Sequence, residues 1–146
     1  MKNEVFNIFY TDDDKDDQDL FKDAAHEVLK TLQIITQENG DELIHSLKNP
    51  PPFPNLIFLD LNMPVKNGYE VLKEIRQSPH IKDLPVIIFS TSDDAKAIST
   101  TRDLGANLYI QKPASFNLLK KAIAYTLSIN WETFSPSDKH FFYQVN

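Results

Sequence analysis

Five short apolar runs recur along the chain, and each is followed by a longer segment whose apolar residues repeat at helical spacing. The runs are residues 5–11, 32–35, 56–59, 86–89 and 108–110. Two of them, 56–59 and 86–89, contain no polar residue. An unbroken apolar run is typical of a parallel strand that is covered by helices on both faces, so we expect these two to be the central strands.

The helical segments complete five strand-helix repeats. They lie within residues 20–29, 43–47, 69–75, 94–104 and 116–127, and a stiff proline-rich connection occupies 49–54. The fourth helix has few apolar anchors, so we expect it to be loosely held, and Ser115 is the expected N-cap of the fifth. This alternation predicts an α/β fold with a doubly wound, five-stranded parallel sheet and right-handed crossovers.

Composition narrows the possible functions. The length of 146 residues fits one domain, and the formal net charge of -6 opposes binding to the phosphate backbone of nucleic acids. The absence of cysteine excludes disulfides and thiolate metal sites. No segment approaches the ~20 apolar residues that cross a bilayer, and the N-terminus does not resemble a signal peptide. We therefore expect a cytoplasmic protein with no direct nucleic-acid or membrane binding.

Polar side chains follow four of the five predicted strands, where ligands bind in sheets of this type. Asp12 and Asp13 follow the first strand, Asp60 the third, Ser90 the fourth and Lys112 the fifth. Each of these residues, taken alone, is more simply interpreted as an ordinary loop residue. Together they predict a site, because three carboxylates near one point repel one another unless a cation such as Mg²⁺ lies between them.

The same residues suit phosphoryl transfer. Asp60 directly follows an apolar strand, and a carboxylate on such a rigid element can attack phosphorus as a nucleophile. The predicted roles of Asp12 and Asp13 are to hold the metal ion. Lys112 and Ser90 are suited to stabilise the charge that gathers on the phosphoryl oxygens.

Several motifs together resemble the receiver domains of response regulators. They are Asp12-Asp13, the segment from Asp60 to Pro64 with Gly68, the segment from Pro85 to Ser90, and the segment from Tyr109 to Pro113. The resemblance covers residues 4–129 and implies a flavodoxin-like (βα)₅ receiver fold. It leaves 130–146 as an aromatic C-terminal extension.

The resemblance implies that Asp60 accepts a phosphoryl group from a sensor histidine kinase or a histidine phosphotransfer protein. It places Mg²⁺, for which Mn²⁺ could substitute, on Asp13, Asp60 and the backbone carbonyl of Asn62, with Asp12 acting mainly through water. The implied chemistry is limited to acceptance of the phosphoryl group and its self-catalysed loss. The implied output is a switch in binding to a downstream protein that the sequence does not specify.

The resemblance also assigns Ser90 and Tyr109 to the switch, in which the Ser90 hydroxyl moves toward the phosphoryl group and the Tyr109 ring turns inward to fill the vacated space. It makes Lys112 the bridge to the phosphate. On its own chemistry alone, Tyr109 is more simply interpreted as a half-buried aromatic residue that only packs against its neighbours in the strand. Asn62 and Ser92 occupy the positions that tune phosphoryl lifetime, and because both are small and neutral we expect open water access. Many members carry Thr where this chain has Ser90, which leaves the packing of that hydroxyl less certain than its role.

Three alternatives compete with this interpretation. A haloacid dehalogenase type phosphatase also uses an aspartyl phosphate with Mg²⁺, but Asn62 stands where its second Asp is required. A scaffold that is never phosphorylated would be expected to lose some of Asp13, Asp60 and Lys112. A calcium loop starting at Asp12 has Asp17 where glycine is needed. The other acidic residues are more simply interpreted as a solvated loop and the negatively charged start of a helix, and they are Asp14, Asp16, Asp17 and Asp19.

The extension carries many aromatic residues, which need a surface to cover. They can pack on their own domain or across a homodimer, and we favour the homodimer slightly. The segment Trp131-Glu132-Thr133 also resembles single-domain regulators that are paired with phytochrome-type kinases.

Overall fold

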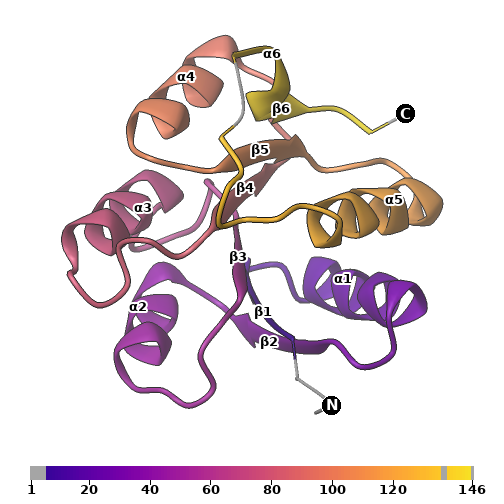
Figure 1. Cartoon of the computed structure of the whole chain (residues 1–146), viewed down its shortest axis with the longest axis horizontal. Helices are drawn as coiled ribbons and strands as arrows, with labels where there is room; N and C mark the ends of the chain where they lie inside the picture. The colour runs from indigo at the N-terminus through magenta and orange to yellow at the C-terminus, as the bar shows by residue number, and fades with distance from the viewer. Residues whose placement is uncertain (1–5, 136–137, 146) are drawn as a thin grey trace.

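The computed structural model describes residues 6–135 and 138–145, which form one twisted sheet with helices on both faces (Figure 1). All strand pairs are parallel, in the order β2-β1-β3-β4-β5-β6. The strands are β1 (Asn7–Thr11), β2 (Gln33–Gln37), β3 (Leu56–Leu59), β4 (Val86–Ser90), β5 (Leu108–Gln111) and β6 (Phe142–Tyr143). The expected α/β doubly wound sheet is confirmed, with β3 and β4 at its centre.

Helices α1 and α5 cover one face of the sheet, and α2, α3 and α4 cover the other (Figure 1). The helices are α1 (Lys15–Val28), α2 (Gly40–Lys48), α3 (Gly68–Gln77), α4 (Ala95–Asp103), α5 (Phe116–Leu127) and α6 (Asp138–Phe141). Each of the first five begins after a side chain that accepts a backbone amide of the first turn, namely Asp14, Asn39, Asn67, Asp94 and Ser115. The expected N-cap at Ser115 is therefore confirmed.

The core lies in two layers, one on each side of the sheet. On the α1 and α5 side, the rings of Tyr10 and Phe21 stack with centroids 4.3 Å apart, and Phe58 and Phe89 pack edge-on against Phe21. All four side chains are 3% exposed or less. This aromatic layer lies directly beneath the carboxyl ends of the strands and gives them a rigid base.

The sheet has six strands and not the expected five, because the C-terminal extension adds β6 to the edge of β5. The register pairs Tyr109 with Phe142 and Ile110 with Tyr143. Phe141 is only 1% exposed, and Tyr143 stacks on Tyr125 with ring centroids 4.0 Å apart. A two-residue strand has no periodicity to detect, so tertiary packing of the aromatic rings decides that it forms.

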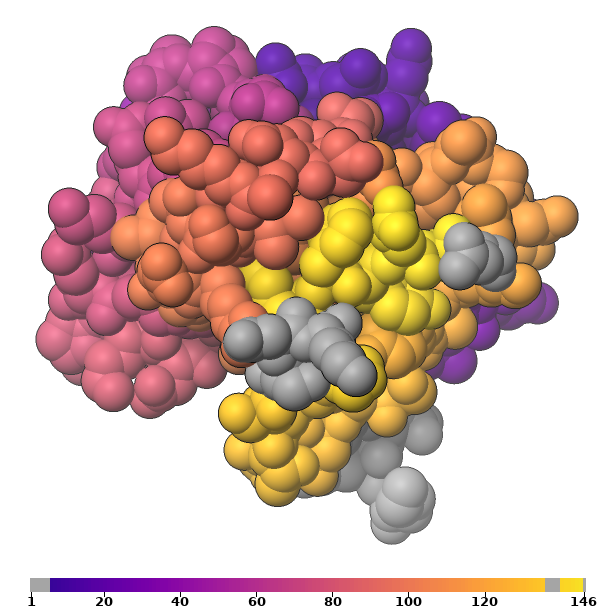
Figure 2. All heavy atoms as spheres, turned by 90° about the horizontal axis from the view of Figure 1, so that it is seen from above, coloured from indigo at the N-terminus to yellow at the C-terminus, as the bar shows by residue number. Residues whose placement is uncertain are grey.

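The extension fills the surface between α4 and α5 (Figure 2). Phe141, Phe142 and Tyr143 therefore pack on their own domain, whereas the association of two copies through the extension stays a prediction. The guanidinium of Arg102 on α4 lies over the Phe141 ring, 5.6 Å from its centroid. This cation–π contact joins α4 to the C-terminal extension. Ala97 and Thr101 are the residues of α4 that are buried, in line with the few anchors seen in the sequence.

The half-buried guanidinium of Arg76 ties two loops to the end of α3. Arg76 donates to the carbonyl of Gly105 at 2.9 Å, to the carbonyls of Lys82 and Leu84 at 2.8 Å each, and to Asn107 Oδ1 at 2.7 Å. Burial lowers the pKa of Arg76 below its ordinary value. This residue therefore fixes the end of α3 to the loops that enter β4 and β5.

We expect Arg76→Gln to lower the free energy of unfolding by about 2–4 kcal/mol, because three loop carbonyls and the Asn107 side chain lose their charged donor. Urea denaturation followed by circular dichroism measures this change. Lys73→Gln removes an exposed cation from the same helix and is the matched control, with an expected effect within about 0.5 kcal/mol. Equal effects of the two substitutions would contradict the assigned role of Arg76.

Candidate phosphoryl-acceptor site

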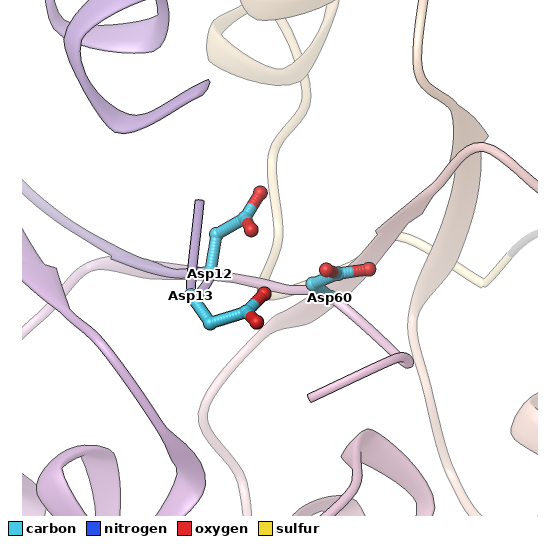
Figure 3. Close-up of side chains that lie close together, drawn as sticks. All are labelled: Asp12, Asp13 and Asp60. Carbon is cyan, nitrogen blue, oxygen red and sulfur yellow. The ribbon is translucent and has the colours of Figure 1, made fainter. Parts of the chain in front are cut away.

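Three carboxyl groups meet at the carboxyl edge of the sheet. Asp12 and Asp13 follow β1, and Asp60 follows the neighbouring strand β3. Each offers an oxygen, and these oxygens all lie within 4.8 Å of one another (Figure 3). Asp12 is 1% exposed and Asp60 8%, whereas Asp13 is exposed. The parallel register therefore gathers negative charge that is only partly accessible to water.

The Lys112 ammonium offsets part of this charge. It follows β5 and donates to Asp12 Oδ2 at 2.7 Å and to Asp17 Oδ2 at 3.0 Å, and it lies 3.8 Å from Asp60 Oδ2. Burial alone would lower the pKa of Lys112, but the hydrogen bond to Asp12 and the charges of Asp60 and Asp12 raise it above its ordinary value. Lys112 is therefore a permanent cation in the site.

Asp60 has an unusual ionisation. Burial raises its pKa to about 6, and Asp12 and Asp13 also act in that direction, while Lys112 and the Asn62 amide oppose it. The carboxyl group is therefore mainly ionised at neutral pH but close to its titration range. A nearby cation would favour the carboxylate further.

Asp12 is held by donors on both oxygens. Oδ2 accepts from the Tyr10 hydroxyl at 2.9 Å as well as from Lys112, and Oδ1 accepts from the Asp14 amide at 3.0 Å. Burial, followed by the charge of Asp12, raises the pKa of Tyr10 above its ordinary value, so this phenol remains a donor. Tyr10 was not recognised in the sequence, although residues two apart on a strand share a face and this spacing could have revealed it.

The loop after Asp60 has a constrained backbone. A Cβ atom at Gly68 would lie 2.6 Å from the Asp60 carbonyl oxygen, so only glycine lets α3 begin this close to Asp60. Val65 has φ of 69°, and the Lys66 amide donates to the Pro64 carbonyl around it, which closes a three-residue γ-turn. The loop therefore reverses direction tightly and returns the chain against Asp60.

The residues expected to form the switch lie beside this cluster. Ser90 at the end of β4 is buried, and its hydroxyl accepts from the Ser92 amide at 3.2 Å. Tyr109 is also buried, and its hydroxyl donates to the Ser92 carbonyl at 2.9 Å. The Phe142 ring packs edge-on against Tyr109 with centroids 5.6 Å apart. Tyr109 thus already points inward, and the extension covers it.

One sequence interpretation of the acidic segment is corrected. Asp17 does not simply face solvent at the helix start, because its carboxylate pairs with Lys112. No periodic signal could have revealed this contact, since it depends on where α1 lies over β5. The calcium loop, which the sequence already disfavoured, does not fit the structure, because Asp14 caps α1 and the chain is helical from Lys15.

Residues 8–124 match the profile of the response regulator receiver domain. The chain belongs to this family. It is thus a receiver domain of the kind used in two-component signalling, as the sequence motifs predicted, and the family as a whole acts in signalling with enzymatic activities confined to fused domains.

Relatives and solved structures agree with this assignment. Response regulator Rcp1 of Synechocystis sp. (strain ATCC 27184 / PCC 6803 / Kazusa) is 34% identical over 125 residues, which cover 80% of this chain and 82% of Rcp1. The phosphorylated cyanobacterial phytochrome response regulator RcpA is 31% identical with a TM-score of 0.77, covering 91% of this chain and 98% of RcpA. The resemblance to phytochrome-associated regulators, which the sequence analysis based on Trp131-Glu132-Thr133, is therefore confirmed by these relatives.

A divalent metal fits the receiver's acidic cluster. The Mn²⁺-bound form of Rcp1 is 32% identical with a TM-score of 0.72, covering 90% of this chain and 99% of that structure. In this chain the carboxylate oxygens of Asp12, Asp13 and Asp60 lie within 4.8 Å of one another, and that donor set suits a hard cation. Within the described residues no helix is both long and apolar enough to span a bilayer.

The raised pKa of Asp60 predicts a pH-dependent stability. Its pKa is about 6 in the folded chain against 3.8 unfolded, so between these values the folded state binds more protons and stability falls as pH rises. We therefore expect metal-free Asp60→Asn to be more stable than the unsubstituted chain above about pH 7, by up to about 3 kcal/mol. The difference should vanish below about pH 4.

Urea denaturation in the presence of EDTA, repeated across this pH range, measures the difference. Asp16→Asn removes an exposed carboxyl group that is outside the cluster and serves as the control. A stability gap between Asp60→Asn and the unsubstituted chain that stays constant with pH would contradict the assignment.

Proposed function

We propose that this receiver domain accepts a phosphoryl group on Asp60 from the phosphohistidine of a sensor histidine kinase or a histidine phosphotransfer protein. The observation that carries the proposal is the meeting of Asp12, Asp13, Asp60 and Lys112 at one point of the sheet edge. Asp60 is the nucleophile, and its carboxylate is held on the loop that Gly68 packs against.

The metal of this site is Mg²⁺, for which Mn²⁺ can substitute, and its ligands are Asp13, Asp60 and the Asn62 backbone carbonyl. Asp12 contacts the ion through water, since both of its oxygens already accept protein donors. When bound, the cation neutralises charge on the carboxylates and on the phosphoryl oxygens. Lys112 and the Ser90 hydroxyl supply further stabilisation of those oxygens from the other side of the site.

The chemistry is self-phosphorylation from donors and self-catalysed loss of the phosphoryl group, with no other substrate. Asn62 lies two residues after Asp60 and is exposed, and its amide cannot act as the general acid that a haloacid dehalogenase type phosphatase requires. Asn62 and Ser92 are small and neutral, which leaves water access to the phosphoryl group open and tunes its lifetime.

The phosphorylated state is read by a downstream protein in the cytoplasm. Ser90 moves toward the phosphoryl group, and Tyr109 responds through the Ser92 segment, because its hydroxyl is bonded to the Ser92 carbonyl. Phe142 packs on Tyr109, so the extension at 130–146 senses the same movement. No direct binding to nucleic acid or membrane is part of this proposal.

We expect a small phosphodonor, acetyl phosphate or phosphoramidate, to label the chain in the presence of Mg²⁺, and Mn²⁺ to support the same reaction. Intact-mass spectrometry and phosphorus NMR detect the adduct. Labelling should vanish in Asp60→Asn and with EDTA, because the nucleophile or the cation is then missing. Equal labelling of Asp60→Asn, or turnover of small phosphate esters, would contradict the proposal.

The extension also forms the surface through which two copies associate. Trp131 and Phe134 support this, since their rings lie 5.2 Å apart and both side chains are only partly buried. We expect light scattering to give a dimer for the unsubstituted chain and a monomer for a chain that ends at Ile129, each with and without phosphodonor and Mg²⁺. Trp131→Ala is a milder variant that keeps β6. A monomeric mass for the unsubstituted chain in both states would exclude the dimer.

A further inference from the structure

The strongest ion-pair contacts of the Lys112 ammonium are not with the acceptor. It lies 2.7 Å from Asp12 Oδ2 and 3.0 Å from Asp17 Oδ2, but 3.8 Å from Asp60 Oδ2. The Lys112 side chain is only 13% exposed, so few water molecules compete for its protons. The Lys112 ammonium thus contacts three carboxylates, and its distance to Asp60 is the longest of the three.

Asp12 and Asp17 differ in how easily their carboxylates can move away from Lys112. Asp12 is buried and is fixed by the Tyr10 hydroxyl and the Asp14 amide, so it cannot leave Lys112 easily. The Asp17 side chain is 37% exposed and has open space beside it. That space is a hollow of about 280 Å³, which Asp17 and Lys112 line together with Thr91. Asp17 can therefore release Lys112 and become hydrated at little cost.

The backbone of Asp17 is nevertheless anchored. Asp14 Oδ1 accepts the amides of Asp16 and Asp17 at 2.9 and 3.1 Å, which fixes the first turn of α1. The Gln18 side chain donates to the Asp12 carbonyl at 2.7 Å and joins this turn to the acidic loop. The Asp17 carboxylate is thus presented to Lys112 by a rigid helix start, and the contact is not a chance meeting of two mobile side chains.

We propose that Asp17 is a positioning residue that acts through Lys112, holding the ammonium away from Asp60 until a phosphoryl group competes for it. The inference rests on the proposed role of Asp60 as acceptor. A phosphoryl group on Asp60 brings oxygens with more charge than the carboxylate alone, and the exposed Asp17 is the competitor that yields. Asp17 therefore sets how readily Lys112 reaches the phosphoryl group, and it restrains the rate of phosphorylation.

Removal of the Asp17 charge should free Lys112 for Asp60. We expect Asp17→Asn to be labelled by phosphoramidate with Mg²⁺ about three- to fivefold faster than the unsubstituted chain, the size of effect typical of a partly exposed ion pair. Asp16→Asn is the matched control, because Asp16 lies in the same turn and is exposed. It removes the same charge from the surface without touching the Lys112 pair, so its rate should change less than twofold.

A second measurement needs no phosphodonor and tests the contact itself. Nitrogen-15 NMR of the lysine ammonium groups, recorded on the metal-free chain, follows Lys112 directly, and Lys112→Arg identifies its signal. We expect Asp17→Asn to shift this signal and Asp16→Asn to leave it in place. A mere loss of helix stability would not move the Lys112 resonance selectively.

The outcomes separate the two proposals. If the unsubstituted chain is not labelled on Asp60, the proposed function fails, while the Lys112 signal still decides whether Asp17 positions the ammonium. If Asp60 is labelled but Asp17→Asn and Asp16→Asn react at equal rates, the inference on Asp17 is overturned and the acceptor role stands. An unchanged Lys112 signal in Asp17→Asn overturns it as well.

Discussion

The ion pair between Lys112 and Asp12 is the contact on which the site depends. A carboxylate as deeply buried as Asp12 is costly unless a charged partner and hydrogen bonds compensate it, and the Lys112 ammonium at 2.7 Å with the Tyr10 hydroxyl provides both. The two partners are 100 residues apart in sequence. They meet because parallel strands bring their carboxyl ends to one edge, so this ion pair exists only in the assembled sheet.

The same arrangement leaves Asp60 reactive. Its neighbours do not fully compensate its charge, because Lys112 is shared, and burial keeps the pKa near 6. The buried aromatic layer beneath the strand ends and the close packing of Gly68 hold the carboxyl group in place. A group that is rigidly held but electrostatically unsatisfied is suited to bind a cation and then a phosphoryl group.

A short series of contacts links Ser90, at the end of β4, to the surface of the protein. Ser90 and Tyr109 both bond to Ser92, and Tyr109 contacts Phe142 on β6. The extension lies between α4 and α5, so a change at Ser92 has a direct physical route to the outer face (Figure 2). Arg76 donates to the Gly105 carbonyl and to Asn107 Oδ1, so it holds the loop that enters β5.

The sequence by itself determined the alternation of strands and helices, the two central strands and the residues at the strand ends, because apolar periodicity and strand polarity are local properties. The convergence of Asp60 and Lys112 at one edge of the sheet could be predicted for that reason. Only the tertiary structure decided that Asp17 shares Lys112, that Tyr10 bonds to Asp12 and that Phe142 and Tyr143 add a sixth strand. These contacts depend on how helices and the chain end lie over the sheet, and that placement follows from the packing of side chains far apart in sequence.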